Sequence, residues 1–236
     1  PMMSVFVERV RAMSRWHLEA PLLQVLLRRT YRGSLIQISH WLIPKEGLPP
    51  GSICYCAGVG EDLEFEASLL KQFDALVFAF DPTPRAIRFV GHRMRDVNKF
   101  VFSPVGLWSE DTILKFFSPT NPRHVSHSVL RDGMRGEYFE APCRRLSTLM
   151  KEHNHDRIDL LKMNIEGAEY EVLRSMMTDR IRPKVLALTF EGPSAFVNAI
   201  RWTRKLSHYG YQFAGLNRWA ATFVFDNRLT NETSKP

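Results

Sequence analysis

The sequence contains little cysteine and no long hydrophobic run. Its three cysteines, Cys54, Cys56 and Cys143, are too few for a disulfide framework in 236 residues, and one would always be left over. We therefore expect buried thiols and a reducing, cytoplasmic location. No uninterrupted apolar stretch approaches the roughly 20 residues that cross a bilayer, which excludes a transmembrane span.

Acidic residues are also in the minority. Asp and Glu number 25 against 32 Lys and Arg, so the formal net charge is +7. This excess favours an anionic partner, whether a nucleic acid, a phosphorylated metabolite or a membrane surface. A nucleic-acid binder is the less favoured interpretation. The arginines near the N-terminus are spread around their helix, and no basic block with interleaved aromatic residues occurs.

Residues 1–50 are expected to form an N-terminal helical extension. Between residues 5 and 32, apolar side chains recur at the three- and four-residue spacing of an amphipathic helix. Three roles fit such an extension: a solvated surface, a lid over a binding site, or the interface of a homo-oligomer. The run Pro49-Pro50-Gly51 then breaks the pattern and marks the start of a different one.

The chain beyond this break alternates short apolar runs with helical stretches. Strands are expected at 52–57, 75–80, 100–105, 158–163, 185–190, 211–216 and 220–225, and helices at 63–73, 84–95, 145–153, 168–177 and 195–209. This alternation predicts an α/β fold with a Rossmann-like, doubly wound, mostly parallel seven-stranded sheet. The last two strands form a hairpin that places an antiparallel C-terminal strand at the sheet edge. We place the domain at residues 51–227 and expect a disordered tail at 228–236.

A glycine loop follows the first strand of this domain. Gly58 and Gly60 would let the backbone approach a ligand closely at the carboxyl edge of the sheet. A dinucleotide site would have a third glycine at position 63, which is Leu63 here, and Glu61 and Asp62 add negative charge where phosphates would bind. The loop therefore favours a positively charged ligand that carries an adenosine.

Asp81 ends the second strand, about 20 residues beyond the glycine loop, which is the spacing of an acid that binds a ribose. A carboxylate there can accept hydrogen bonds from both ribose hydroxyls. The alternative is that Asp81 only caps the turn before Pro82.

A third stretch identifies a family. The residues from Asp159 to Leu173 resemble the signature of the FkbM-type methyltransferases, a branch of the class I S-adenosylmethionine-dependent enzymes. The pattern Asp-x-x-Lys-x-Asp-x-Glu-Gly-x-Glu matches at every fixed position except Asn164. The segments from Phe80 to Pro84 and from Ser103 to Trp108 are also similar to that family, so the resemblance covers residues 51–191.

The resemblance implies S-adenosylmethionine as cofactor, and O-methylation of a hydroxyl on a small-molecule or sugar-containing metabolite. It implies that the cofactor binds at Gly58, Gly60, Glu61, Asp62, Asp81, Gly106, Leu107 and Asn164, and that the catalytic candidates are His127, Asn164, Glu166 and Glu191. An N-methyltransferase and an RNA-directed methyltransferase are alternatives. The acceptor is expected to be a small molecule, and the positive net charge favours an anionic one.

Asn164 stands where the family has an acid, and it leaves three interpretations open. The site is catalytically impaired, the amide accepts a hydrogen bond from a target amine, or Asn164 is an engineered or purely structural residue. A metal is not expected. The loop that holds His153, His155 and Asp156 lies at the end of the sheet opposite the cofactor.

Overall fold

The computed structural model describes residues 19–117, 138–191 and 194–232. Its main sheet has seven strands in the order β11-β12-β10-β9-β3-β4-β5. These strands are β3 (Ile53–Ala57), β4 (Leu76–Phe80), β5 (Phe100–Ser103), β9 (Leu160–Met163), β10 (Val185–Thr189), β11 (Tyr211–Asn217) and β12 (Ala220–Phe225). Strands β5, β4, β3, β9 and β10 are parallel, whereas β12 runs antiparallel to β10 and β11. The predicted α/β fold is confirmed, with the β11–β12 hairpin at one edge of the sheet. Contrary to the expectation, the antiparallel strand β12 does not itself form the edge, because β11 lies outside it.

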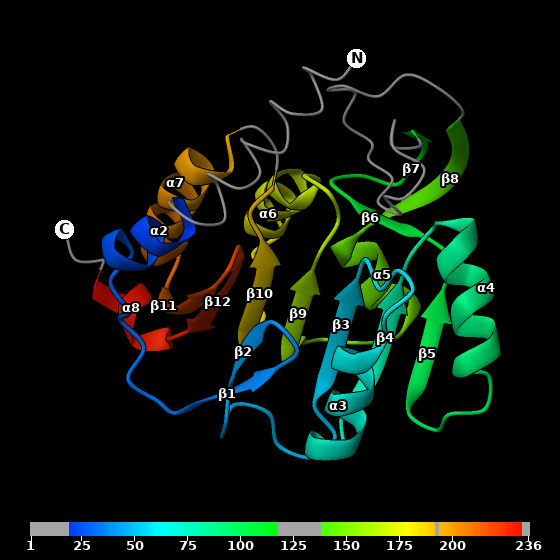
Figure 1. Cartoon of the computed structure of the whole chain (residues 1–236), viewed down its shortest axis with the longest axis horizontal. Helices are drawn as coiled ribbons and strands as arrows, with labels where there is room; N and C mark the ends of the chain where they lie inside the picture. Colours follow the sequence, from blue (N-terminus) through cyan, green and yellow to red (C-terminus); the bar gives the residue numbers. More distant parts are fainter. Residues whose placement is uncertain (1–18, 118–137, 192–193, 233–236) are drawn as a thin grey trace, which may run out of the picture.

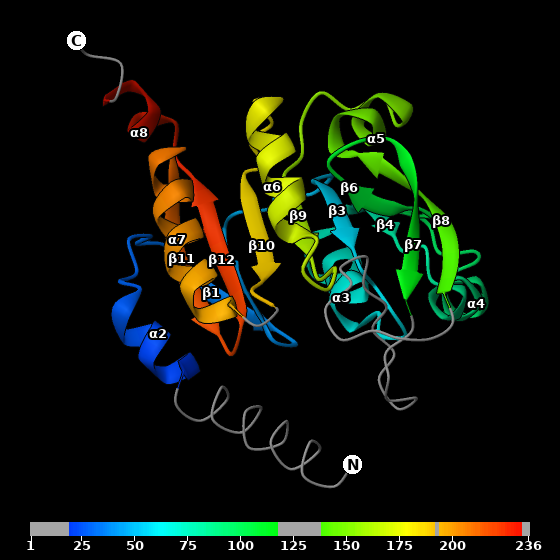
Figure 2. The ribbon, with the colours of Figure 1, turned by 90° about the horizontal axis from the view of Figure 1, so that it is seen from above.

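Helices cover both faces of this sheet (Figures 1 and 2). One face carries α5 (Leu146–Glu152), α6 (Glu169–Thr178) and α7 (Ala195–His208), and the other carries α3 (Glu64–Phe73) and α4 (Pro84–Arg93). In α3, the buried side chains of Phe65, Leu69 and Phe73 recur every four residues and form one apolar stripe against the sheet. Such stripes fix which side of each helix meets the strands.

The N-terminal segment is less helical than the sequence suggested. Helix α2 (Ala20–Leu26) ends at Leu27 instead of continuing to residue 32, and the expected helix over residues 5–18 lies outside the described residues. The chain leaves the helix because it pairs with the edge strand β11. The backbone N–H groups of Thr30 and Tyr31 donate to the carbonyl oxygen of Phe213, and Phe213 N–H donates to the Thr30 hydroxyl at 2.8 Å.

Residues 35–44 form a β-hairpin that the sequence analysis did not predict. Strands β1 (Leu35–Ile38) and β2 (Trp41–Pro44) pair antiparallel, and Trp41 and Ile43 are fully buried in the core on the α3 side of the sheet. Part of the expected tail is also ordered. Helix α8 (Asn227–Glu232) begins where the Asp226 carboxylate accepts the backbone N–H of Arg228 at 3.1 Å.

A second, three-stranded sheet was also missed. It has the order β6-β8-β7 and consists of β6 (Gly106–Trp108), β7 (Thr112–Phe117) and β8 (Tyr138–Arg145). Its strands are short or half-exposed, which gives them a weak sequence signal. This sheet lies near the carboxyl ends of the main parallel strands (Figure 1).

The buried thiols expected from the sequence are observed. All three cysteines are free and buried, and burial raises the pKa of the Cys143 thiol to about 11. None of the helices within the described ranges has the length and apolar character needed to cross a membrane.

Candidate functional site

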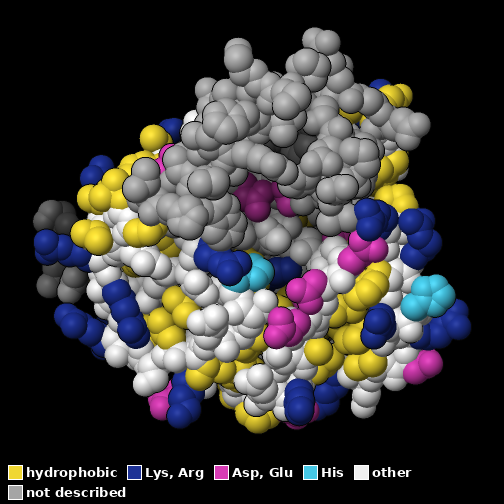
Figure 3. Space-filling model, viewed as in Figure 1, with side chains coloured by type: hydrophobic (Ala, Val, Ile, Leu, Met, Phe, Trp, Pro, Cys, Tyr) yellow, Lys and Arg dark blue, Asp and Glu magenta, His cyan; other side chains and the backbone are white. Residues whose placement is uncertain are grey.

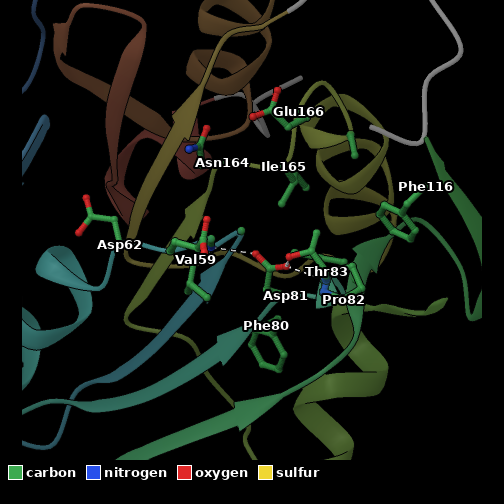
Figure 4. Close-up of a pocket in the computed structure, with 16 residues that line it drawn as sticks. Val59, Asp62, Phe80, Asp81, Pro82, Thr83, Phe116, Asn164, Ile165 and Glu166 are labelled. Atoms are coloured by element: carbon green, nitrogen blue, oxygen red, sulfur yellow. Dashed lines mark hydrogen bonds between the residues drawn. The ribbon is translucent and has the colours of Figure 1, made fainter. Parts of the chain in front are cut away.

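A cavity opens at the carboxyl ends of β3, β4 and β9 (Figure 4). Its volume of about 240 Å³ far exceeds the roughly 10–15 Å³ that one water molecule needs, so it can accept an organic ligand. Most of the residues that the sequence singled out come together in its wall. These are Gly58, Gly60, Glu61, Asp62, Asp81, Gly106, Leu107, Asn164 and Glu166.

Two catalytic candidates are not among these lining residues. Glu191 follows β10 and does not line the cavity; its backbone oxygen accepts a hydrogen bond from the Tyr170 hydroxyl at 3.2 Å. His127 lies outside the described residues. The prediction also missed lining residues. Most of these are chain neighbours of predicted ones, but Phe116 comes from β7 of the small sheet, and nothing in the sequence connects it to the site.

Gly58 forms the tightest point of the site. Its φ angle is +75°, and a Cβ atom there would lie 1.9 Å from the backbone oxygen of Asn164. Its N–H donates to the carbonyl oxygen of Phe80 at 2.9 Å, which joins the loop to the neighbouring strand β4. Only glycine satisfies both the left-handed backbone and the close approach.

A buried ion pair contacts the glycine loop through the carbonyl oxygen of Gly58. The Lys162 ammonium donates to the carbonyl oxygen of Gly58 at 2.8 Å and lies 3.5 Å from a carboxylate oxygen of Glu66. Both side chains are almost fully buried, and Nζ of Lys162 lies 5.9 Å from the centroid of the Trp41 ring. Lys162 is the lysine of the family signature, and its contact here is with the glycine loop.

Asp81 binds the glycine loop at Gly60. Its carboxylate accepts the N–H of Gly60 at 2.9 Å, the N–H of Thr83 at 2.8 Å and the Thr83 hydroxyl at 2.6 Å. The turn-capping alternative is therefore observed. It does not exclude ribose binding, because a carboxylate has about four acceptor sites and Asp81 also lines the cavity. Its role toward a ribose remains a prediction.

The turn after β9 is held in an uncommon conformation. Glu166 has a φ angle of +55° and Gly167 one of +96°. The fully buried carboxylate of Glu169 fixes this turn, because it accepts the N–H groups of Ile165 and Gly167, each at 2.8 Å. A left-handed non-glycine residue at a cavity is a feature that clusters at functional sites.

Glu169 makes the stability of the protein depend on pH. Burial raises its pKa to about 7 from an ordinary value of 4.5. The folded state then binds more protons than the unfolded state between these values, so this contribution is complete below pH 4.5 and is lost as the pH rises through 7. Relative to Glu169→Gln, we expect the wild-type free energy of unfolding to fall by about 2–3 kcal/mol between pH 5 and pH 8.

Urea titrations at several pH values measure this difference. The matched control is Glu171→Gln on the same helix, because Glu171 is 40% exposed and pairs with Arg174 at the surface. A wild-type curve parallel to that of Glu169→Gln would contradict the prediction.

The lining of the cavity is acidic. Among the described residues it contains four carboxylates, from Glu61, Asp62, Asp81 and Glu166, and no Lys, Arg or His. On the surface seen in Figure 3, a few acidic side chains lie near the middle of the view, with Lys and Arg side chains both close to them and around the edge. An acidic cavity beside a glycine loop fits a ligand with positive charge and disfavours a diphosphate.

The histidine loop far from this cavity has a packing role. Nδ1 of His155 lies 2.8 Å from the Tyr55 hydroxyl, and the rings of His153 and His155 pack against Phe78. Within the described residues, no group of three or more His, Cys, Asp or Glu side chains could hold a metal ion.

The strand order and the cavity at the strand ends place the chain among the α/β proteins that bind a small cofactor outside the carboxyl ends of a Rossmann-like sheet. A family model described as the methyltransferase FkbM domain matches residues 53–213. The chain therefore belongs to the FkbM methyltransferase family and is an S-adenosylmethionine-dependent methyltransferase. The positive charge of the sulfonium of this cofactor fits the acidic lining of the cavity.

Several solved structures are similar to this chain. An rRNA methylase from Streptococcus thermophilus is 14% identical, with a TM-score of 0.45 over 77% of this chain and 90% of that one. Aeropyrum pernix fibrillarin, in complex with S-adenosyl-L-methionine, is 10% identical, with a TM-score of 0.44 and coverage of 75% and 67%. Precorrin-6y C5,15-methyltransferase from Geobacter metallireducens is 13% identical, with a TM-score of 0.42 and coverage of 77% and 85%. No curated protein matches significantly.

Proposed function

We propose that this methyltransferase methylates a hydroxyl oxygen of a small-molecule or sugar-containing metabolite. The observation that supports the proposal is the cavity lining, which has four carboxylates and no cationic side chain among the described residues. Such a lining attracts the cationic cofactor and repels phosphates. A small acceptor is therefore favoured over RNA. The anionic acceptor suggested by the net charge gains no support from this lining.

Different lining residues are assigned to different parts of the cofactor. Gly58, Gly60 and Asp62 would hold the methionine part of the cofactor, Asp81 the ribose, and Leu107 the adenine edge. Bound S-adenosylmethionine supplies an activated methyl group, whose bond to sulfur breaks as a bond to the acceptor oxygen forms. Alignment and exclusion of water are then the main tasks of the protein.

The acceptor hydroxyl must also lose its proton. Glu166 is the catalytic candidate in the cavity wall with a carboxylate that can take this proton, since Glu191 does not line the cavity. Glu166 lies in the left-handed turn that precedes Gly167 and lines the cavity. Asn164 cannot serve as the base because an amide does not take up a proton at neutral pH.

Calorimetry with S-adenosylhomocysteine tests the cofactor site. We expect Asp81→Asn to weaken binding at least about tenfold, or 1.4 kcal/mol. An amide has one acceptor oxygen, so its N–H2 group would face a donor N–H of Gly60 or Thr83. The control is Asp74→Asn, because Asp74 is 62% exposed and pairs with Lys99 at the surface; its affinity should stay at the wild-type value.

Two outcomes would overturn this proposal. The first is wild-type protein that binds neither S-adenosylmethionine nor S-adenosylhomocysteine. The second comes from a mass-spectrometric screen of cell extract with methyl-labelled cofactor. A labelled methyl ether of a small metabolite is expected, and a labelled amine or RNA would show that the acceptor class is wrong.

A further inference from the structure

The cavity offers a ligand very few side-chain hydrogen-bond donors. Among the described lining residues, only Thr83 and Asn164 have an N–H or O–H group on the side chain. The Thr83 hydroxyl is already used, because it donates to the Asp81 carboxylate at 2.6 Å. Within this part of the chain, the Asn164 amide is thus the side-chain donor that remains for a ligand.

The direction of this amide is set from the neighbouring strand. Leu188 of β10 pairs with Met163 of β9, so the next residues, Thr189 and Asn164, lie side by side at the strand ends. The buried Thr189 hydroxyl donates to Oδ1 of Asn164 at 2.9 Å. The structure gives Nδ2 of Asn164 no hydrogen-bond partner among the residues it describes.

Thr189 has a single hydroxyl hydrogen and a second acceptor within reach, since Oε1 of Glu169 lies 3.1 Å away. Burial raises the pKa of Glu169 to about 7, and Glu166 is the neighbouring charge that adds to this shift. A protonated Glu169 can donate to the oxygen of Thr189. The Thr189 hydrogen is then available for Asn164, and the chain of hydrogen bonds runs in one direction from Glu169 to Asn164.

Building on the methyl transfer proposed above, we propose that Thr189 is a positioning residue that turns the N–H2 group of Asn164 toward the cavity, where it binds the acceptor oxygen. Figure 4 shows Asn164 and Glu166 on one side of the cavity and Asp81 and Thr83 on the other. Asn164 and the candidate base Glu166 are two positions apart in the sequence and both line the cavity. A hydroxyl oxygen has two lone pairs. One accepts the hydrogen bond from Asn164, and the other attacks the methyl group.

An amine cannot satisfy this arrangement. A neutral amine nitrogen has one lone pair, which must attack the methyl group and so cannot accept a hydrogen bond as well. Asn164 could assist an amine only through its own oxygen, and the hydrogen bond from Thr189 already takes one of the two lone pairs of that oxygen. The replacement of the family acid by Asn164 thus favours oxygen over nitrogen as the methylated atom.

Nuclear magnetic resonance of the Asn164 side chain tests this proposal without turnover. In protein labelled with 15N-asparagine and saturated with S-adenosylhomocysteine, the loss of one signal pair in Asn164→Ala assigns the N–H2 group. Two neutral five-membered rings are then added: tetrahydrofuran, which only accepts hydrogen bonds, and pyrrole, whose N–H group donates one. We expect tetrahydrofuran to shift the Asn164 signals at least about fivefold more than pyrrole does.

Variants at Thr189 distinguish the loss of the Asn164 amide orientation from a general loss of structure. Thr189→Ser keeps the hydroxyl and should behave like the wild type, whereas Thr189→Val frees the amide to turn and should remove the preference for tetrahydrofuran. An equal response to both rings in the wild type, or no response to either, would refute the proposal even if the protein methylates its acceptor.

The oxygen bound by Asn164 has two chemical sources, the acceptor and the carboxylate of the cofactor. Calorimetry distinguishes them, because Asn164→Ala should change the affinity for S-adenosylhomocysteine by less than about twofold if the acceptor is the source. A tenfold or greater loss would assign the contact to the cofactor and overturn its assignment to the acceptor.

Discussion

A single methyl group at position 58 is expected to abolish cofactor binding. In Gly58→Ala, the new Cβ would lie 1.9 Å from the backbone oxygen of Asn164 and 2.7 Å from its carbonyl carbon. The two segments cannot move apart easily, because Asn164 N–H donates to the carbonyl oxygen of Ala57 at 3.0 Å. The strands that precede Gly58 and Asn164, β3 and β9, are also paired in the middle of the sheet. We expect the affinity for S-adenosylhomocysteine to fall at least about 100-fold, or roughly 2.7 kcal/mol.

The same change should also destabilise the fold. A non-glycine residue with a φ angle of +75° costs about 1–3 kcal/mol, and overpacking adds a similar amount. Gly60→Ala is the matched control, because Gly60 also has a positive φ angle but a Cβ there meets no atom within 4 Å. Calorimetry and urea unfolding of both variants measure the difference. Equal effects at the two glycines would show that the close approach to Asn164 is unimportant.

Breaking the buried ion pair between Lys162 and Glu66 is expected to have the second large effect on stability. Lys162→Met leaves the Glu66 carboxylate buried without its counter-charge, and Oε2 of Glu66 already has no hydrogen-bond partner among the described residues. Removal of one partner of a buried pair costs about 3–5 kcal/mol, so we expect the free energy of unfolding to fall by that amount. Cofactor affinity should fall as well, because the glycine loop loses the hydrogen bond to Gly58.

Two variants test the cause of this loss. The double variant Lys162→Met, Glu66→Leu removes both charges and should recover most of the lost stability, since a buried ion pair can often be replaced by apolar residues. Lys99→Met breaks the pair with Asp74 on the surface and should cost less than about 1 kcal/mol. If the double variant is no more stable than the single one, the unpaired charge of Glu66 is not the cause.

The sequence predicted the main sheet and much of the cavity because both rest on local patterns. Strand ends of a parallel sheet converge at one edge, so Gly58, Asp81 and Asn164 could be placed together without knowledge of their contacts. The residues adjacent to them in the sequence could be placed at the cavity for the same reason. The roles of Lys162 and Glu169 could not be predicted this way, because each depends on the distance between a buried side chain and a backbone group.

Other parts of the site depend on pairing between distant segments. Thr189 faces Asn164 only because of the register of β9 and β10, which no single motif contains. Phe116 reaches the cavity through the small sheet, whose strands alternate weakly between exposed and buried positions. The first hairpin was missed because its two strands have only four residues each, which is too short for a clear period.

The pairing of residues 30 and 31 with β11 also affects how the molecules behave toward one another. An edge strand with unpaired backbone groups can add a strand from a second molecule and start aggregation. Here the Phe213 N–H and carbonyl groups are both occupied by the chain's own Thr30 and Tyr31. The segment before the first hairpin therefore closes this edge of the sheet to strand addition at Phe213, a task separate from catalysis.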